Sequence, residues 1–300
     1  MTKEWSKFIQ PPTYLKATRQ AYLNNEFSAF TARICGVFDG SHVLEVGCGT
    51  GCFSKFLSES VQNVTFVGID IDKKLLDNGL DVIGDNTIEY IEASAYSLPF
   101  KEKSFDAVFC HTFFNCVSDP PAAMREMKRV VKKGGPITSV TSMSMGYETW
   151  YKGDYPDDCK WRYEIDVYTN DMVAAMEKLK LGPFSNNLGY PASKMPSFFS
   201  QSGLKDISIY PLSRAFSLSN GTMSVEEKKE YITNIYLGDI ERLNGAMEIG
   251  EFLLLFPVEK CILYREALQK RYDFWIHHLH DNTIWDWFGS SSLIVKGLCE

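Results

Sequence analysis

The chain has 300 residues, of which 45% are hydrophobic and 23% charged, and its formal net charge at pH 7 is −7. These values are ordinary for a globular protein and exclude the disordered and collagen-like classes. An acidic chain without a run of Lys or Arg also argues against nucleic-acid partners, which need several cations on one face. The eight cysteines lack CxxC spacing, and neither a signal peptide nor a membrane span is evident, so we expect a cytoplasmic protein without membrane association.

The first half of the chain predicts a parallel sheet preceded by helices. Residues Tyr14–Phe38 have apolar side chains at helical spacing and contain no proline. From Ser41 to Thr141, short β-branched and aromatic runs alternate with helical stretches, as expected when crossover helices cover both faces of a parallel sheet. The predicted strands are Val43–Val46, Val64–Asp70, Ile88–Ala93, Phe105–Cys110 and Ile137–Thr141, and the predicted crossover helices are Cys52–Ser60, Lys73–Leu80 and Ala122–Lys132.

The second half of the chain adds two strands and a long helical region. Asp206–Tyr210 predicts a sixth strand after a helix over Met195–Ser202, and Leu293–Lys296 a short seventh strand. Between the two strands, Ser224 and Glu227 form a capping box, and Pro257 suits the first residue of another helix.

These elements predict an α/β fold with a Rossmann-like, seven-stranded, mostly parallel sheet, N-terminal helices and a helical cap inserted before the last strand. The expected parts are N-terminal helices acting as a lid at residues 1–40, a core at residues 41–212 and 291–300, and the cap at residues 213–290.

A glycine-rich turn follows the first predicted strand and is the strongest chemical signal. The strand reads Val-Leu-Glu-Val and runs into Gly47, Gly49 and Gly51, which let the backbone turn tightly and approach a ligand closely. The glycines follow GxGxG and not the dinucleotide-binding GxGxxG, and Glu45 places a negative charge where a pyrophosphate would be repelled and an ammonium group attracted.

The next strand ends at Asp70, which lies 23 residues after Gly47. This is about the offset at which a carboxylate meets a ribose diol. A ligand with a ribose, an amino-acid tail and a sulfonium fits both features, so we predict S-adenosylmethionine as the cofactor.

Residues Ser41–Thr141 resemble the class I S-adenosylmethionine-dependent methyltransferases, in particular the small-molecule group related to ubiquinone and menaquinone biosynthesis enzymes. The resemblance rests on the glycine turn and on the motifs at Ala93–Phe100, Ser104–Val108 and Ser118–Pro120. The usual Asp of the family is Ser94 here, which weakens the expected contact with the adenine amino group or leaves it to the backbone.

The resemblance implies a set of cofactor-binding residues. Those expected at the methionine tail are Glu45, Gly47, Cys48 and Gly49, and Asp70 is expected at the ribose. Those expected at the adenine are Ile71, Ser94 and Ala95. Cys110 and His111 are expected to line the tail and face the methyl group, and Tyr14 is expected as a further cofactor contact from the N-terminal helices. His111 is the candidate catalytic residue; its alternative is a backbone role.

The predicted function is methyl transfer from S-adenosylmethionine to a small-molecule acceptor, with a homodimer left open. The alternatives are a tRNA or protein methyltransferase, a non-catalytic regulatory protein in which Phe113 and Phe114 block the methyl side, and a nicotinamide-dependent oxidoreductase, which Glu45 and the glycine spacing disfavour. The aromatic-rich helical cap and the N-terminal helices are expected to cover the acceptor pocket.

Two further patterns have a structural and a functional interpretation. Asp273, His277 and His280 share one side of a predicted helix, as metal ligands could, but a solvated polar face explains them equally well, so no metal is expected. Trp285 and Trp287 flank Asp286 and could form a wall for a cationic substrate or simply pack.

Overall fold

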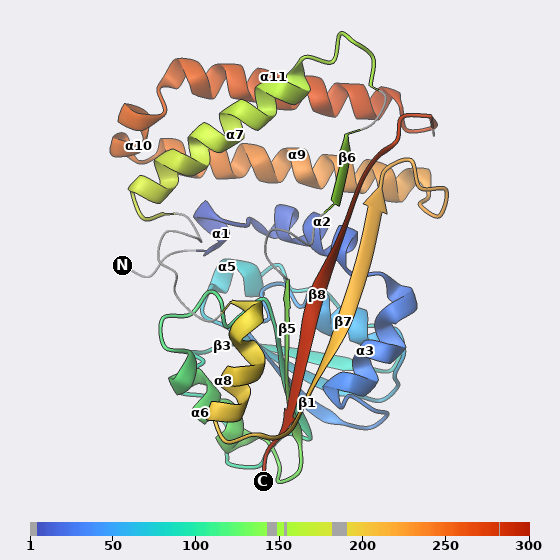
Figure 1. Ribbon diagram of the computed structural model, residues 1–300, viewed down its shortest axis with the longest axis vertical. Helices are drawn as coiled ribbons and strands as arrows, with labels where there is room; N and C mark the ends of the chain where they lie inside the picture. Colours follow the sequence, from blue (N-terminus) through green and yellow to red (C-terminus); the bar gives the residue numbers. More distant parts are fainter. Residues whose placement is uncertain (1–4, 143–148, 153–154, 182–190, 282) are drawn as a thin grey trace. The chain divides into compact units, whose positions relative to one another are not determined.

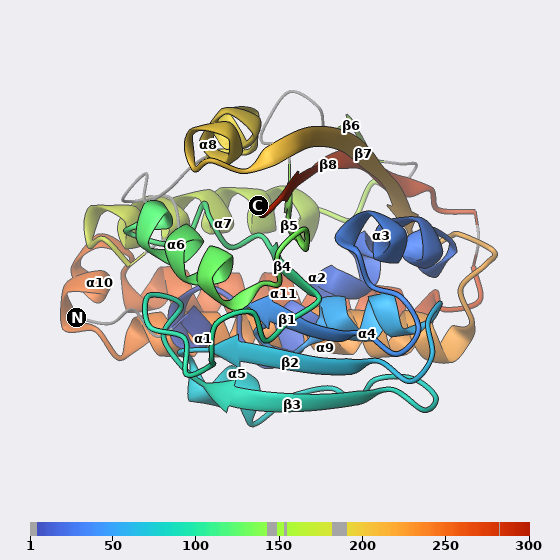
Figure 2. The ribbon, with the colours of Figure 1, turned by 90° about the horizontal axis from the view of Figure 1, so that it is seen from below.

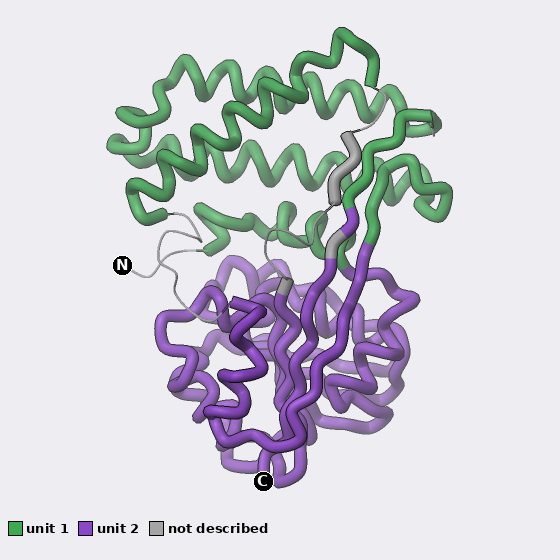
Figure 3. The backbone as a smooth tube through the Cα atoms, viewed as in Figure 1, with its two compact units in different colours: residues 1–22, 150–186, 215–288 green, residues 23–149, 187–214, 289–300 purple. Residues whose placement is uncertain are grey.

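A computed structural model describes residues 5–142, 149–152, 155–181, 191–281 and 283–300. The chain divides into two compact units, coloured separately in Figure 3. The helical unit comprises Met1–Tyr22, Trp150–Asn186 and Ala215–Phe288. The sheet unit comprises Leu23–Thr149, Asn187–Arg214 and Gly289–Glu300. No helix in the described part of the chain is both long enough and apolar enough to cross a membrane.

The sheet has eight strands in the order β3-β2-β1-β4-β5-β8-β6, with β7 paired to β8 (Figures 1 and 2). The first five strands are parallel, and β8 is antiparallel to β5. The chain therefore winds from β1 to one side and returns at β4 to build the other. The strands are β1 (His42–Val46), β2 (Thr65–Asp70), β3 (Thr87–Glu92), β4 (Ala107–His111), β5 (Pro136–Ser142), β6 (Thr149–Lys152), β7 (Lys205–Ser217) and β8 (Asp286–Leu298).

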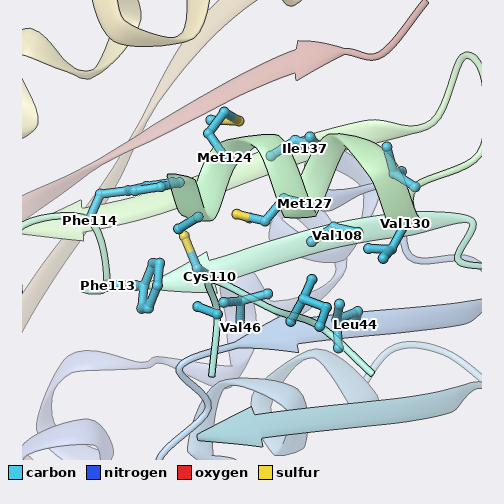
Figure 4. Close-up of a cluster of buried hydrophobic side chains, with 14 of the residues drawn as sticks. Leu44, Val46, Val108, Cys110, Phe113, Phe114, Met124, Met127, Val130 and Ile137 are labelled. Carbon is cyan, nitrogen blue, oxygen red and sulfur yellow. The ribbon is translucent and has the colours of Figure 1, made fainter. Parts of the chain in front are cut away.

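Alternating side chains of the central strands enter two separate apolar clusters, one on each face. Leu44, Val46, Val108 and Cys110 point toward Met124, Met127 and Val130 of α6, as Figure 4 shows. The intervening side chains of the same strands pack against α3 and α4 in the second cluster. Burial on both faces explains why these strands read as continuous apolar runs. The helices of the sheet unit are α3 (Ser28–Cys35), α4 (Cys52–Ser58), α5 (Lys73–Leu76), α6 (Pro120–Val130) and α8 (Met195–Gln201), with 3-10 turns at Asn25–Phe27 and Ala192–Lys194.

The predicted α/β class and the mostly parallel sheet are confirmed, but the strand count of seven is wrong. The strand β6, which has four residues, was not predicted, and β7 and β8 are longer than the strands predicted from the sequence. Both strands have 13 residues. Pro211 and Arg214 interrupt the apolar run of β7, and its exposed positions outnumber its buried ones, so hydrophobicity marks only part of the strand.

The helical unit contains α1 (Trp5–Phe8), α2 (Pro12–Tyr22), α7 (Trp161–Lys178), α9 (Val225–Met247), α10 (Gly250–Leu255) and α11 (Val258–His277). The capping box is confirmed, because the Ser224 side chain accepts from the Glu227 N–H and the Glu227 carboxylate accepts from the Ser224 N–H. Pro257 is the N-cap of α11, one residue before the helix begins, and not its first residue as predicted. Apolar residues of α7, α9, α10 and α11 share one core, so the region 213–290 packs against α7.

Candidate cofactor site

The carboxyl ends of β1, β2, β3 and β4 lie at one edge of the sheet. Val46 pairs with Ile69, Asp70 with Glu92, and Glu45 with Phe109. Because these strands are parallel, the loops that follow them start side by side, where the chain reverses its winding direction. Open α/β sheets bind ligands at such a position. The predicted residues between Glu45 and His111 all come from these strand ends.

The glycine turn after β1 is built from left-handed residues. Gly47, Gly49 and Gly51 have φ angles of 71°, 56° and 72°, which residues with a Cβ adopt only at a cost. The N–H groups of Gly47 and Cys48 both donate to the Ile69 carbonyl, at 2.8 and 2.9 Å, which ties the turn to β2. The spacing of the glycines therefore reflects a required backbone path.

Neighbouring aromatic rings leave no room for larger residues in this turn. A Cβ on Gly47 would lie 2.5 Å from the Phe113 ring, and one on Gly51 would lie 2.0 Å from the Tyr90 hydroxyl. Phe113 thus covers Gly47, whereas Phe114 is fully buried among Phe198 and other core residues. Packing in the core accounts for Phe114 without any blocking role.

Asp70 joins the glycine turn to the end of β2. Its Oδ2 accepts from the Gly49 N–H at 2.9 Å and its Oδ1 from the Asp72 N–H at 3.0 Å. Burial raises the pKa of Asp70, and these backbone hydrogen bonds oppose the rise. Since each carboxylate oxygen can accept more than one hydrogen bond, the group retains acceptor capacity for hydroxyls.

Glu45 is buried in β1, with 2% of its surface exposed. Its Oε2 accepts from the Ser54 N–H at 3.1 Å and the Ser54 hydroxyl at 2.5 Å. Ser54 lies in the first turn of α4, where a carboxylate interacts favourably with the helix dipole. Glu45, predicted from the sequence to attract an ammonium group, therefore also anchors α4, which its local sequence does not indicate.

The loop after β3 carries the predicted adenine contacts. Ala95 is buried, Ser94 is exposed, and its hydroxyl accepts from the Tyr96 N–H at 3.2 Å. At the end of β2, Ile71 is 57% exposed, which leaves an aliphatic surface there. An exposed aliphatic side chain suits contact with the flat face of an aromatic base.

A salt bridge that was not predicted from the sequence fixes the far end of this loop. Arg129 binds both oxygens of Glu126, at 2.8 and 2.7 Å, and donates to the carbonyls of Phe100 and Leu98 at 2.7 and 2.9 Å. Glu126 also accepts from the Leu98 N–H at 2.8 Å. Both ions come from α6, so the loop is held to that helix by charge-assisted bonds.

The end of β4 contributes Cys110 and His111. The Cys110 side chain points into the core toward α6 (Figure 4), and burial raises the pKa of its thiol to about 12, so it stays protonated. His111 is 8% exposed and stacks on Phe53 with 4.9 Å between ring centroids. Thr112 follows with a φ of 50°, which is strained for a β-branched residue. Strain of this kind clusters at functional sites.

Tyr90 of β3 also contributes to the site without having been predicted from the sequence. Its ring faces Gly51, Gly68 and Gly79, each of which would crowd it if it carried a Cβ. Its hydroxyl donates to the Leu80 carbonyl at 2.7 Å and lies 3.2 Å from the Thr50 carbonyl. In the sequence these three glycines stand at unrelated positions. Only the folded structure shows that all three lie against the Tyr90 ring.

The remaining predicted residues lie in the helical unit. Tyr14 is on α2, packed against Gly238 of α9. Asp273 accepts from Gln269 at 2.8 Å, and the described residues contain no group of three metal-ligating side chains. Asp286 accepts from the Tyr155 hydroxyl at 2.6 Å, while Trp285 and Trp287 are 45% and 37% exposed.

Comparison with known proteins identifies the class of the sheet unit. Residues 44–138 match the family described as a methyltransferase domain. A demethylmenaquinone methyltransferase of Bacillus pumilus is 25% identical over 185 residues, 60% of this chain and 78% of that one. A ubiquinone/menaquinone biosynthesis C-methyltransferase of Hahella chejuensis is 38% identical over 112 residues, 35% of this chain and 45% of that one.

Several further relatives are matched over about half of their length. Among solved structures, a phosphoethanolamine N-methyltransferase 2 of Haemonchus contortus in complex with S-adenosyl-L-methionine is 15% identical with a TM-score of 0.46, covering 99% of this chain and 59% of that one.

The parallel sheet, the glycine turn and the acid after β2 define a Rossmann-like nucleotide-binding unit. The family match makes residues 44–138 of this unit a class I S-adenosylmethionine-dependent methyltransferase domain, and S-adenosylmethionine is the cofactor of this domain. Both predictions made from the sequence are thereby confirmed.

Proposed function

We propose that the protein transfers the methyl group of S-adenosylmethionine to a small-molecule acceptor. The observation that carries the proposal is the hydrogen bond from the Gly49 N–H to Asp70, which holds a carboxylate that can accept from ribose hydroxyls beside the glycine turn. The names of the relatives support a small-molecule acceptor, because they are quinone-pathway methyltransferases.

The bound cofactor supplies a methyl group on a sulfonium, which is already a good leaving group. We assign Asp70 to the ribose hydroxyls, Ile71 and the Ser94–Ala95 segment to the adenine, and Glu45 with the turn at Gly47–Gly49 to the amino-acid tail. The chain's contribution is then to hold the reactants in line and to exclude water. His111 is assigned as proton acceptor for an acceptor molecule that arrives protonated.

Asp70→Ala tests the cofactor assignment by calorimetry. Loss of the charge-assisted bonds to the ribose should weaken the binding of S-adenosylmethionine and its demethylated product by about 1.5 to 3 kcal/mol. Asp119→Ala is a matched control, because it removes an acid whose Oδ1 caps α6 and does not bond to the glycine turn. Unchanged affinity in Asp70→Ala would refute this site.

The pH dependence of cofactor affinity gives a second test of the same residue. Burial raises the pKa of Asp70 above the ordinary value of 3.8, so its carboxylate becomes protonated at a higher pH than that of an exposed Asp. Affinity should therefore fall on acidification before ordinary aspartates titrate, and Asp70→Asn should abolish this part of the profile. Identical acid profiles for the two proteins would contradict the assignment.

We further propose that the helical unit determines which acceptor is used, since the methyltransferase match ends at residue 138. Replacement of residues 213–290 by a linker is a poor test, because it would expose the core that α9, α10 and α11 share with α7. Trp285→Ala is a milder change at a 45% exposed ring, with Tyr163→Ala, at 72% exposure, as control. A changed KM for the acceptor with unchanged cofactor affinity is the expected result for Trp285→Ala only.

A further inference from the structure

The helical unit contains two arginines that share one carboxylate. Arg271 of α11 donates to Oδ2 of Asp239 at 2.7 Å, and Arg242 of α9 lies 3.5 Å from Oδ1 of the same residue. The side chains of Asp239, Arg242 and Arg271 are 8%, 14% and 23% exposed. Because guanidinium groups stay charged at any ordinary pH, these three groups together carry one surplus positive charge in a largely buried place.

Nearby phenols do not neutralise this charge. Burial raises the pKa of Tyr14 to about 12 and also raises the pKa values of Tyr231 and Tyr264. All three are therefore neutral near pH 7. The Tyr14 ring lies 5.1 Å from the Arg242 guanidinium, and the Tyr264 hydroxyl is paired with Thr169 at 2.9 Å.

Arg242 also has donor capacity that the described residues do not use. Its Nε is buried and has no hydrogen-bond partner among the described groups. A buried guanidinium nitrogen without an acceptor is costly, and the contact of Arg242 with Asp239 is long. Arg242 and Arg271 each keep part of their side-chain surface in contact with solvent.

We propose that Arg242 and Arg271, with Tyr14 beside them, form a binding site in the helical unit for the carboxylate or phosphate group of a small molecule. Planar guanidinium groups recognise such anions through paired, charge-assisted hydrogen bonds. An anion would offset the surplus charge and supply the acceptor that the Arg242 Nε lacks. The neutral aromatic rings would contact the apolar part of the ligand.

The site is tested on the full chain without cofactor, so the result does not depend on methyl transfer. The midpoint of thermal unfolding is measured against benzoate and, separately, inorganic phosphate, with ionic strength held constant by sodium chloride. A ligand that binds the folded state raises the midpoint in a saturable way. We expect such a rise with benzoate, with phosphate or with both, and the stronger of the two identifies the anion class.

Arg242→Met should abolish the saturable rise, because it leaves Asp239 and Arg271 as a neutral pair. Arg265→Met is the matched control: it removes the same charge from α11, where Arg265 donates to Asn244 in an exposed bond, and should keep the rise. If Arg242→Met does not fold, Arg242→Lys keeps the charge, removes the planar donor group and should weaken binding roughly tenfold. No saturable rise in the unmodified protein, or an unchanged rise in the Arg242 variant, would overturn the proposal.

Discussion

The sheet unit and the helical unit gather their polar groups in different ways. In the sheet unit, the candidate site consists of main-chain turns at the ends of neighbouring strands, with Asp70 as the side chain that links them. In the helical unit, Asp239, Arg242 and Arg271 come from two helices and meet through their side chains. A site made of turns tolerates little change in backbone shape, whereas a site made of side chains depends on how the helices pack.

The largest expected effect concerns that packing. Phe252 of α10 is fully buried beside Phe256, with 5.5 Å between the ring centroids. Phe252→Ala should reduce the free energy of unfolding by about 3 to 5 kcal/mol, because it leaves a cavity. Leu254→Ala on the same helix removes a side chain that is 82% exposed and should change it by less than about 0.5 kcal/mol. Chemical denaturation of both variants checks this difference, and equal effects would contradict it.

A second comparison separates backbone strain from close packing in the glycine turn. Gly51 and Gly84 have similar φ angles, 72° and 68°, but a methyl group on Gly51 would lie 2.0 Å from the Tyr90 hydroxyl, whereas one on Gly84 would have no neighbour within 4 Å. Gly84→Ala should cost about 1 kcal/mol from the left-handed conformation. Gly51→Ala should cost about 3 kcal/mol, because it adds overpacking, and it should also abolish cofactor binding. Chemical denaturation and calorimetry of both variants test this difference. Equal losses of stability would show that the Tyr90 ring moves aside to make room for the methyl group.

Loss of the Arg129 bonds that hold the loop after β3 should have an intermediate effect on stability. Arg129→Met removes the pair with Glu126 and two bonds to carbonyls, which should destabilise the fold by about 2 kcal/mol. Arg125→Met, at an exposed position on α6, is the control.

The same bond to Arg129 lowers the pKa of Glu126 below 4.5. Its contribution to stability is therefore complete above the ordinary Glu pKa and is lost as the pH falls through the lowered value. Arg129→Met should remove this part of the acid dependence of stability. If the denaturation midpoint of Arg129→Met falls on acidification as steeply as that of the unmodified protein, the Arg129–Glu126 pair does not contribute to stability in this way.

The smallest effect is expected for the Tyr90 hydroxyl. Tyr90→Phe keeps the ring that faces three glycines and removes only the hydroxyl that bonds to the Leu80 carbonyl, so the expected cost is about 1 kcal/mol. Tyr163→Phe, on a ring that is 72% exposed, serves as control. Cofactor affinity measured by calorimetry should fall slightly in Tyr90→Phe if the hydroxyl positions the glycine turn, and an equal or larger fall in Tyr163→Phe would argue against that role.

Local rules explain what could be predicted from the sequence. The alternation of buried strands with helices, the glycine turn before α4, Asp70 at the end of β2 and the capping box at Ser224 each depend on neighbours in the chain. Such signals survive in a linear sequence because the backbone conformation they require is set within a few residues. The cofactor class followed from them, whereas the full length of β7 was missed because a half-exposed strand lacks a continuous apolar run.

The sequence alone thus determined the class of fold, the glycine turn and the acid that together indicate S-adenosylmethionine. Only the tertiary structure decided that Tyr90 fills the space left by three separate glycines, that Arg129 holds Leu98 and Phe100, and that Arg242 and Arg271 share Asp239. Most of these contacts join residues that are far apart in the chain or on different elements. Their energies depend on distance, burial and charge in three dimensions, and no local pattern of residue types encodes those quantities.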